Sequence, residues 1–244
     1  KMFVEVGDQV RVEDLIQGVI VQSGNDASIV LAEALGGTEE EFARRMSERA
    51  RAIGMENSNF MNSTGWPHDE HYSTARDLAI LAERLIRDYP EYYHYYSQLE
   101  FTYNDIRQGN RNPLLYRNMG ADGLKTGHTE EAGYGLTASA ERDGQRLILV
   151  VGGLDSAQTR ADEAARLMEW GFREFEALEL FEAGETVTTG KTWMGNPEDL
   201  PLVLAEDLAL SIRAGTSSDV DLVVRIDEPV PAPVSAGEQV ATLV

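Results

Sequence analysis

The stretch Asp122-Gly123-Leu124-Lys125-Thr126-Gly127 stands just before two apolar runs, at residues 134–140 and 146–151, which Asp143-Gly144 separates. An Asp-Gly pair between two such runs is a strong signal for a tight β-hairpin. The two runs are therefore predicted to form antiparallel strands, and Lys125-Thr126-Gly127 is predicted to lie on a strand edge beside them.

The sequence before this stretch is predicted to be mainly helical. Apolar residues follow a helical period from Val12 to Val21, and the next helix is predicted to begin at Asn25 or Asp26, either of which can cap it. Thr38 and Glu41 have the spacing of a capping box, and Ser73 or Thr74 is expected to start a further helix that Pro90 ends. A closing helix is predicted over residues 161–175. Helices followed by a hairpin-rich sheet indicate an α+β fold.

The composition changes after about Ala177, where short apolar alternations are separated by Gly, Pro, Ser and Asp. This pattern predicts a small all-β, sandwich-like domain over residues 177–244, following a larger domain over residues 1–176.

The charge and the cysteine content exclude several classes of function. The 42 Asp and Glu residues outnumber the 21 Lys and Arg residues and give a net charge of −21. A nucleic-acid partner is therefore not expected, because such proteins need clustered cations. The chain has no cysteine, so thiol catalysis and thiolate metal sites are excluded. The loop that contains His68 and His71 is interpreted as solvated, and no metal is expected.

Lys125-Thr126-Gly127 has the residue types of an anion-binding strand. Lysine supplies a positive charge for a substrate carboxylate, threonine can hydrogen-bond the same group, and glycine lets a substrate backbone approach. Neighbouring backbone N–H groups can stabilise an oxyanion. The alternative is an ordinary strand start with a solvated lysine.

Ser23-Gly24-Asn25 is typical of a turn between helices, and that is its simplest interpretation. In an active site, Ser23 could relay a proton to a leaving group and Asn25 could hold a substrate amide. The two triplets occur here in the order, and about 100 residues apart, of two of the three motifs of penicillin-binding proteins and class A β-lactamases.

The resemblance extends beyond these triplets. Residues 15–27, Asn110-Arg111-Asn112, residues 122–129 and Trp170-Gly171-Phe172 resemble the low-molecular-mass D-alanyl-D-alanine carboxypeptidases, which are penicillin-binding proteins of peptidase family S11. The resemblance implies a β-lactamase-like transpeptidase domain and a small β domain. It also implies removal of the terminal D-Ala from peptidoglycan stem peptides through a serine acyl-enzyme, binding of β-lactams at the same site, and no cofactor.

The resemblance also assigns roles to residues. Ser23, Asn25 and Lys125 are predicted to be catalytic, while Thr126, Gly127 and His128 are predicted to bind substrate, with the backbone N–H of His128 in the oxyanion hole. A substrate or drug carboxylate is a candidate partner for Arg111 and Arg160, for which the alternative is a surface or structural ion pair.

The nucleophile motif of the family, Ser-x-x-Lys, does not occur in this chain: Asp122 lies three residues before Lys125, and Thr188 three before Lys191. In the family this motif lies N-terminal to the region that resembles Lys1 onward. The chain is therefore expected to be truncated at its N-terminus and, as written, not to be acylated.

Several alternatives stay open. A D,D-endopeptidase would share the same motifs, and a class A β-lactamase would need a Glu-x-x-Leu-Asn arrangement that the sequence between the two motifs lacks. An inert peptidoglycan-binding envelope protein is the non-enzymatic alternative. The resemblance places the protein in the periplasm, at the outer face of the inner membrane. Peripheral attachment there would use a C-terminal helix that this chain does not include.

Overall fold

The hairpin predicted at Asp143-Gly144 belongs to a three-stranded antiparallel sheet in the computed structural model, which describes all residues from 1 to 244. The sheet has the order β3 (Ala121–Thr129), β4 (Gly133–Arg142), β5 (Gln145–Leu154). Asp143 and Gly144 have φ values of 48° and 82°, the positive values that a type I′ turn requires. The hairpin is confirmed, and β3 lies at an edge of the sheet with β4 on one side only.

The helical part that precedes the sheet follows local capping signals. The helices are α1 (Val12–Ile20), α2 (Asn25–Gly36), α3 (Glu39–Ala52), α4 (Ala75–Asp88) and the short α5 (Pro90–Tyr93). The side chains of Thr38 and Thr74 accept hydrogen bonds from the backbone N–H groups of Glu41 and Asp77, as expected of N-cap residues. Pro90 does not simply end α4: it is the first residue of α5, where its missing N–H costs nothing.

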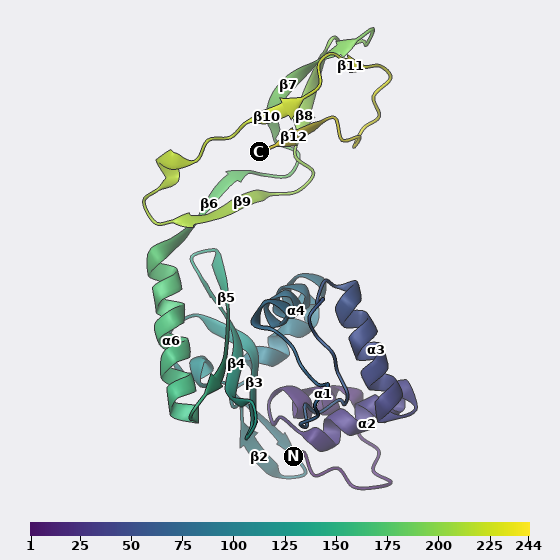
Figure 1. Cartoon of the computed structure of the whole chain (residues 1–244), viewed down its shortest axis with the longest axis vertical. Helices are drawn as coiled ribbons and strands as arrows, with labels where there is room; N and C mark the ends of the chain where they lie inside the picture. The colour runs from purple at the N-terminus through teal and green to yellow at the C-terminus, as the bar shows by residue number, and fades with distance from the viewer. The chain divides into compact units, whose positions relative to one another are not determined.

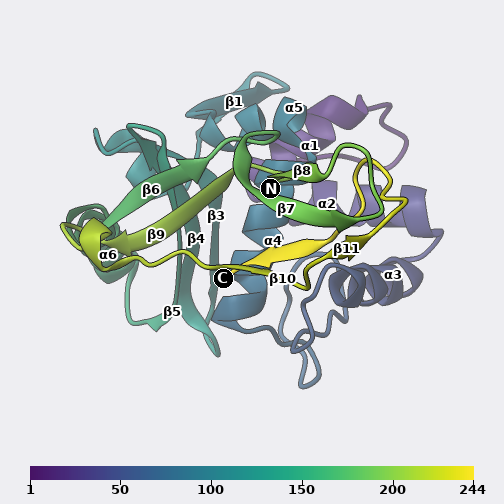
Figure 2. The same cartoon turned by 90° about the horizontal axis from the view of Figure 1, so that it is seen from above.

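Short elements connect the helices to the sheet. They are the 3-10 turn η1 (His94–Ser97), the hairpin of β1 (Glu100–Tyr103) with β2 (Ile106–Gly109), and the 3-10 turn η2 (Pro113–Tyr116). The closing helix α6 (Ala157–Glu174) begins four residues earlier than predicted. It lies on the side of the sheet opposite α1 to α4 (Figures 1 and 2), so the sheet has helices on both faces.

The chain divides into two compact units, Lys1–Trp170 and Gly171–Val244. After the end of α6, the second unit contains only strands and the 3-10 turn η3 (Ser217–Asp219), in agreement with the predicted all-β composition. Its strands are β6 (Phe175–Phe181), β7 (Thr186–Trp193), β8 (Asp199–Val203), β9 (Leu208–Arg213), β10 (Val224–Ile226), β11 (Val230–Pro231) and β12 (Ala241–Leu243). They pair as β6-β9, β11-β7-β8 and β10-β12. The domain boundary expected after residue 176 stays a prediction.

None of the helices combines the length and the apolar character needed to cross a membrane.

Buried residues of the first unit pack beside two of the sequence segments noted above, Ser23-Gly24-Asn25 and Asn110-Arg111-Asn112. Met2, Leu15 and Ala27 form a buried cluster between the start of the chain, α1 and α2. Leu114 of η2, with no exposed surface, is separated from the Asn110-Arg111-Asn112 segment only by Pro113, and its backbone N–H donates to the side chain of Asn112.

Truncation of Leu114 provides a test of this core. Leu114→Ala is expected to lower the free energy of unfolding by about 2–5 kcal/mol, because it leaves a cavity in place of a fully buried side chain. Leu35→Ala on α2 is the matched control, since Leu35 is 60% exposed and the change should stay within about 0.5 kcal/mol. Urea unfolding followed by tryptophan fluorescence measures both, and equal effects of the two variants would contradict this assignment of the core.

Candidate active site

Ser23 lies in the tight connection between α1 and α2. Its φ is +51°, an uncommon value for a residue other than glycine and one that is found more often at functional sites. The backbone N–H of Gly24 donates to the carbonyl of Gly18 at 2.9 Å. A Cβ on Gly24 would lie 3.0 Å from a carboxylate oxygen of Asp26, so little room is left for a side chain there. Helix α2 begins directly afterwards, at Asn25.

Asp26 does not cap α2, and that prediction is wrong. Gly24 is the N-cap residue, and no side chain caps the helix. The carboxylate of Asp26 instead accepts the backbone N–H groups of Met2, Phe3 and Val4 at 2.9, 2.6 and 3.3 Å. Burial opposes ionisation, but these N–H groups, together with that of Ala27, lower the pKa of Asp26. Asp26 therefore ties residues 2–4 to the Ser23-Gly24-Asn25 turn.

Lys125 of β3 reaches across to this turn. Its ammonium group donates to the hydroxyl of Ser23 at 2.7 Å and to the carbonyl of Thr126 at 2.8 Å. Burial, together with the positive charges of Arg111 and Arg160, lowers the pKa of Lys125 to about 8. The structure therefore places an amine that is partly deprotonated near neutral pH in direct contact with a serine hydroxyl.

The residues predicted for the site line one cavity of about 1600 Å³ in the first unit. Four contiguous positions come from β3, and the others come from the α1–α2 turn, the segment before η2 and α6. The eight residues are Ser23, Asn25, Arg111, Lys125, Thr126, Gly127, His128 and Arg160. The fold thus brings all of them together, while their individual roles stay predictions.

The three cations of the cavity have no acidic partner. Lys125, Arg111 and Arg160 form no ion pair, although the chain has twice as many acidic as basic residues. The ion-pair interpretation of the two arginines is therefore wrong. Arg160 is only 8% exposed, and its Nε has no hydrogen-bond partner. Burial lowers the pKa of Arg160, and such a desolvated cation is ready to accept an anion.

Tyr134 is a site residue that the sequence motifs did not indicate. It is the cross-strand partner of His128, and the two rings stack with centroids 3.7 Å apart. The guanidinium carbon of Arg160 lies 5.6 Å from the centre of the Tyr134 ring, within the range of a cation–π contact. Tyr134 thus orients both His128 and Arg160. This role follows from the register between β3 and β4, which the sequence motifs do not give.

The structure contains no group of three His, Asp or Glu side chains arranged to hold a metal ion. His71 borders the cavity, and its Nδ1 accepts the backbone N–H of Met61 at 3.4 Å. Burial and the neighbouring His68 lower the pKa of His71.

Comparison with known proteins identifies the family of the chain. Residues 1–156 match the family model described as D-alanyl-D-alanine carboxypeptidase, and residues 175–244 match that of the penicillin-binding protein 5 C-terminal domain. The chain therefore belongs to the D-alanyl-D-alanine carboxypeptidase family of low-molecular-mass penicillin-binding proteins, with the α+β transpeptidase-like fold and the all-β C-terminal domain predicted from the sequence.

Two curated relatives and one solved structure illustrate the similarity. D-alanyl-D-alanine carboxypeptidase DacC of Escherichia coli is 41% identical over 99% of this chain, and DacA of Haemophilus influenzae is 39% identical over 100%. The chain spans 61% and 63% of the length of these two relatives. Penicillin-binding protein 5 from Haemophilus influenzae is similar with a TM-score of 0.94 and 39% identity, over 100% of this chain and 72% of that one.

The lowered pKa of Lys125 can be tested directly, because the chain has only three lysines. In protein labelled with 13C at the lysine ε-carbon, the NMR signal of Lys125 is expected to titrate near pH 8. Lys191 is expected to titrate above 10.5, because the Asp199 carboxylate raises its pKa. Lys125→Met and Lys191→Met assign the signals. A Lys125 signal that titrates together with that of Lys191 would contradict the described site.

Proposed function

We propose that this chain forms the anchoring and proton-relay side of the active site of a serine D,D-carboxypeptidase. In this proposal the enzyme removes the terminal D-Ala from peptidoglycan stem peptides and binds β-lactams at the same site. The observation that carries it is the convergence of Lys125, Arg111 and Arg160 on one cavity without any acidic partner. Such a site suits a ligand with a free carboxylate, which stem peptides and penicillins share.

Substrate binding would use the free edge of β3. An extended peptide can add to a strand edge through backbone hydrogen bonds. Gly127 is open for this purpose, since a Cβ there would meet nothing within 4 Å. The terminal carboxylate would be held by Lys125, Thr126 and the arginines. Asn25 would bind the substrate amide, and the backbone N–H of His128 would stabilise the oxyanion.

Proton transfer would run through the hydrogen bond between Ser23 and Lys125. Around pH 8 the amine is about half protonated, so this pair can pass a proton in either direction. A nucleophilic serine would attack the carbonyl and give up its proton to the lysine of its own Ser-x-x-Lys motif. The bond to the terminal D-Ala nitrogen would then break as that nitrogen takes a proton from Ser23, which Lys125 reprotonates. Water would then hydrolyse the ester. The chain has no Ser-x-x-Lys set, so the proposal requires this serine from elsewhere in the complete protein.

The proposal also covers location. Stem peptides lie in the cell envelope, so the protein would act there, outside the cytoplasm. Peripheral attachment at the outer face of the inner membrane is the corresponding expectation from the family resemblance.

Labelling with fluorescent penicillin tests the acyl-enzyme mechanism in the protein expressed from its full gene. The wild type is expected to form a covalent adduct. Lys125→Ala should slow acylation by about 100-fold, as expected for loss of a group that stabilises developing charge. Lys191→Ala is the matched control and should react like the wild type, because Lys191 lies in the second unit. An unlabelled wild type, or normal labelling of Lys125→Ala, would contradict the proposal.

Carboxylate recognition can be measured on the 244-residue chain itself. An acetylated peptide ending in D-Ala-D-Ala is expected to bind, and its C-terminal amide is expected to bind at least about tenfold more weakly. Arg160→Gln should cause a similar loss for the free acid. Arg166→Gln on the same helix should cause none, since Arg166 is exposed and pairs with Glu163. Isothermal titration measures all four, and equal affinity for acid and amide would exclude carboxylate anchoring.

A further inference from the structure

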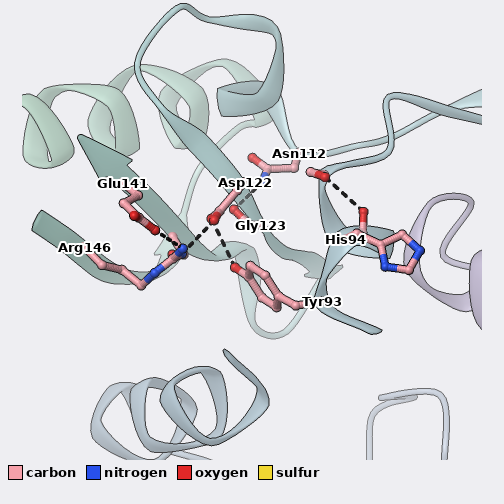
Figure 3. A network of polar contacts seen from close by, with 9 residues as sticks. Tyr93, His94, Asn112, Asp122, Gly123, Glu141 and Arg146 are labelled. Carbon is pink, nitrogen blue, oxygen red and sulfur yellow. Dashed lines mark hydrogen bonds and ion pairs between the residues drawn. The ribbon is translucent and has the colours of Figure 1, made fainter. Parts of the chain in front are cut away.

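A polar cluster lies behind the start of β3 and outside the cavity. Its centre is Asp122, three residues before Lys125. Figure 3 shows the Asp122 carboxylate between the hydroxyl of Tyr93 and the guanidinium of Arg146, at 3.2 and 2.7 Å. None of these three residues borders the cavity, so they cannot touch a ligand bound there.

The cluster coincides with an irregularity in the sheet. Ala121 pairs with Ala140, but Gly123 pairs with Ser139, so β3 takes two steps where β4 takes one. Asp122 is therefore the extra residue of a β-bulge and has no partner in the ladder. A bulge shifts the alternation of side chains by one position, and all residues that follow it change faces relative to a regular strand.

The bulge lies directly before the part of β3 that lines the cavity, residues 124–129. After it, Leu124 is 3% exposed in the core, and Lys125 points to Ser23. Without the extra residue, the remainder of β3 would have to shift by one position against β4. Lys125 would then lose the orientation in which it contacts Ser23. The geometry of the candidate site thus depends on the bulge.

Arg146 ties all three strands together at this point. From β5 it donates to the hydroxyl of Ser139 on β4 at 2.6 Å and to Asp122 on β3. Ser139 has no exposed surface, and the Arg146 and Asp122 side chains are only 26% and 27% exposed. Because this ion pair is partly shielded from water, it is screened less than a pair on the open surface.

Tyr93 and Asn112 hold the same point from the helical side. Burial and the Asp122 charge raise the pKa of Tyr93, so its hydroxyl stays protonated and donates to Asp122. A Cβ on Gly123 would lie 2.4 Å from the Tyr93 hydroxyl, so Tyr93 packs directly on the strand. The buried Asn112 side chain donates to the Gly123 carbonyl at 2.7 Å, as Figure 3 shows.

We infer that Asp122, with Tyr93 and Arg146, is a positioning residue that holds the β3 bulge and thereby orients Lys125 toward Ser23. This inference rests on the proposed function for the role of Lys125, but the contact it explains is independent of turnover. Removal of the Asp122 carboxylate can change the pKa of Lys125 in two ways, which have opposite directions. Loss of a nearby negative charge alone would lower that pKa, whereas release of Lys125 into water would raise it.

Asp122→Ala in the full chain tests the inference through two NMR signals. The Lys125 ε-carbon is expected to titrate at higher pH, moving from about 8 toward 10.5. The ring protons of His128 should lose the displacement caused by stacking on Tyr134, because the register beyond the bulge changes. Glu141→Gln is the matched control. Glu141 pairs with the same Arg146 but lies outside the bulge and is 48% exposed, so both signals should stay unchanged.

Two more conservative variants test the positioning role of Asp122 if Asp122→Ala does not fold. Asp122→Asn keeps an acceptor for Tyr93 but loses the charge, and Tyr93→Phe removes one donor. Each should move the Lys125 titration upward by part of the full effect. An unchanged or lowered pKa of Lys125 in folded Asp122 variants would overturn the inference, as would an equal shift in Glu141→Gln. If the wild-type chain failed to bind D-Ala-D-Ala peptides while these shifts occurred, the proposed function would fail and the positioning role would stand.

Discussion

The hydrogen bond between the Lys125 ammonium and the Ser23 hydroxyl joins residues 102 positions apart in the chain. It connects the edge strand of the sheet to the turn between two helices, and both segments line the cavity. Keeping a lysine out of water is costly unless its charge is lowered or partnered. Here burial and two nearby arginines lower the pKa, and the serine and a backbone carbonyl supply the acceptors. The surrounding structure therefore keeps Lys125 in contact with Ser23, although burial and the nearby arginines disfavour its positive charge.

The cations of the cavity have no acidic partner, in contrast to many other arginines of the chain. Most ion pairs of the chain join exposed arginines to exposed carboxylates, often one helical turn apart, and such pairs add little stability. The three cations that line the cavity lack such partners, whether buried as Arg160, half-buried as Lys125 or exposed as Arg111. With 42 acidic residues available, none is placed against Lys125, Arg111 or Arg160. Three unpaired positive charges around one cavity favour the binding of an external anion.

Local signals in the sequence predicted much of the fold. Thr38 and Thr74 cap helices through contacts three residues away, and Asp143-Gly144 sets a turn through its own backbone angles. These effects depend on neighbours in sequence and can be read without the fold. Asp26 was misjudged for the same reason: locally it resembles a helix cap, but apart from the N–H of the adjacent Ala27 its partners lie 22 to 24 residues away. The motifs at Ser23 and Lys125 do not by themselves say that the two residues are close in space. Their order and separation in the sequence, which match those of two motifs of the family, indicated that they belong to one site.

The supporting residues could not be predicted in this way. Tyr134 acquires its role only when the hairpin register sets it opposite His128 and helix α6 brings Arg160 over its ring. From the sequence, Asp122 is a turn-forming residue before a strand. No sequence pattern indicates the bulge or the contacts of Asp122 with Tyr93 and Arg146. Such residues act through tertiary contacts, which is why motif searches find the groups that carry chemistry before those that orient them.

The contact between Ser23 and Lys125 can be measured most directly with a thiol, because the chain has no cysteine. Ser23→Cys would provide a single thiol at the position of the hydroxyl, and its alkylation rate as a function of pH gives the thiol pKa. A cation in contact stabilises the thiolate, so the account predicts a pKa below the ordinary value of about 8.5 and a rise when Lys125→Met is added. Identical pH profiles with and without Lys125 would show that the two groups do not meet and would contradict the account.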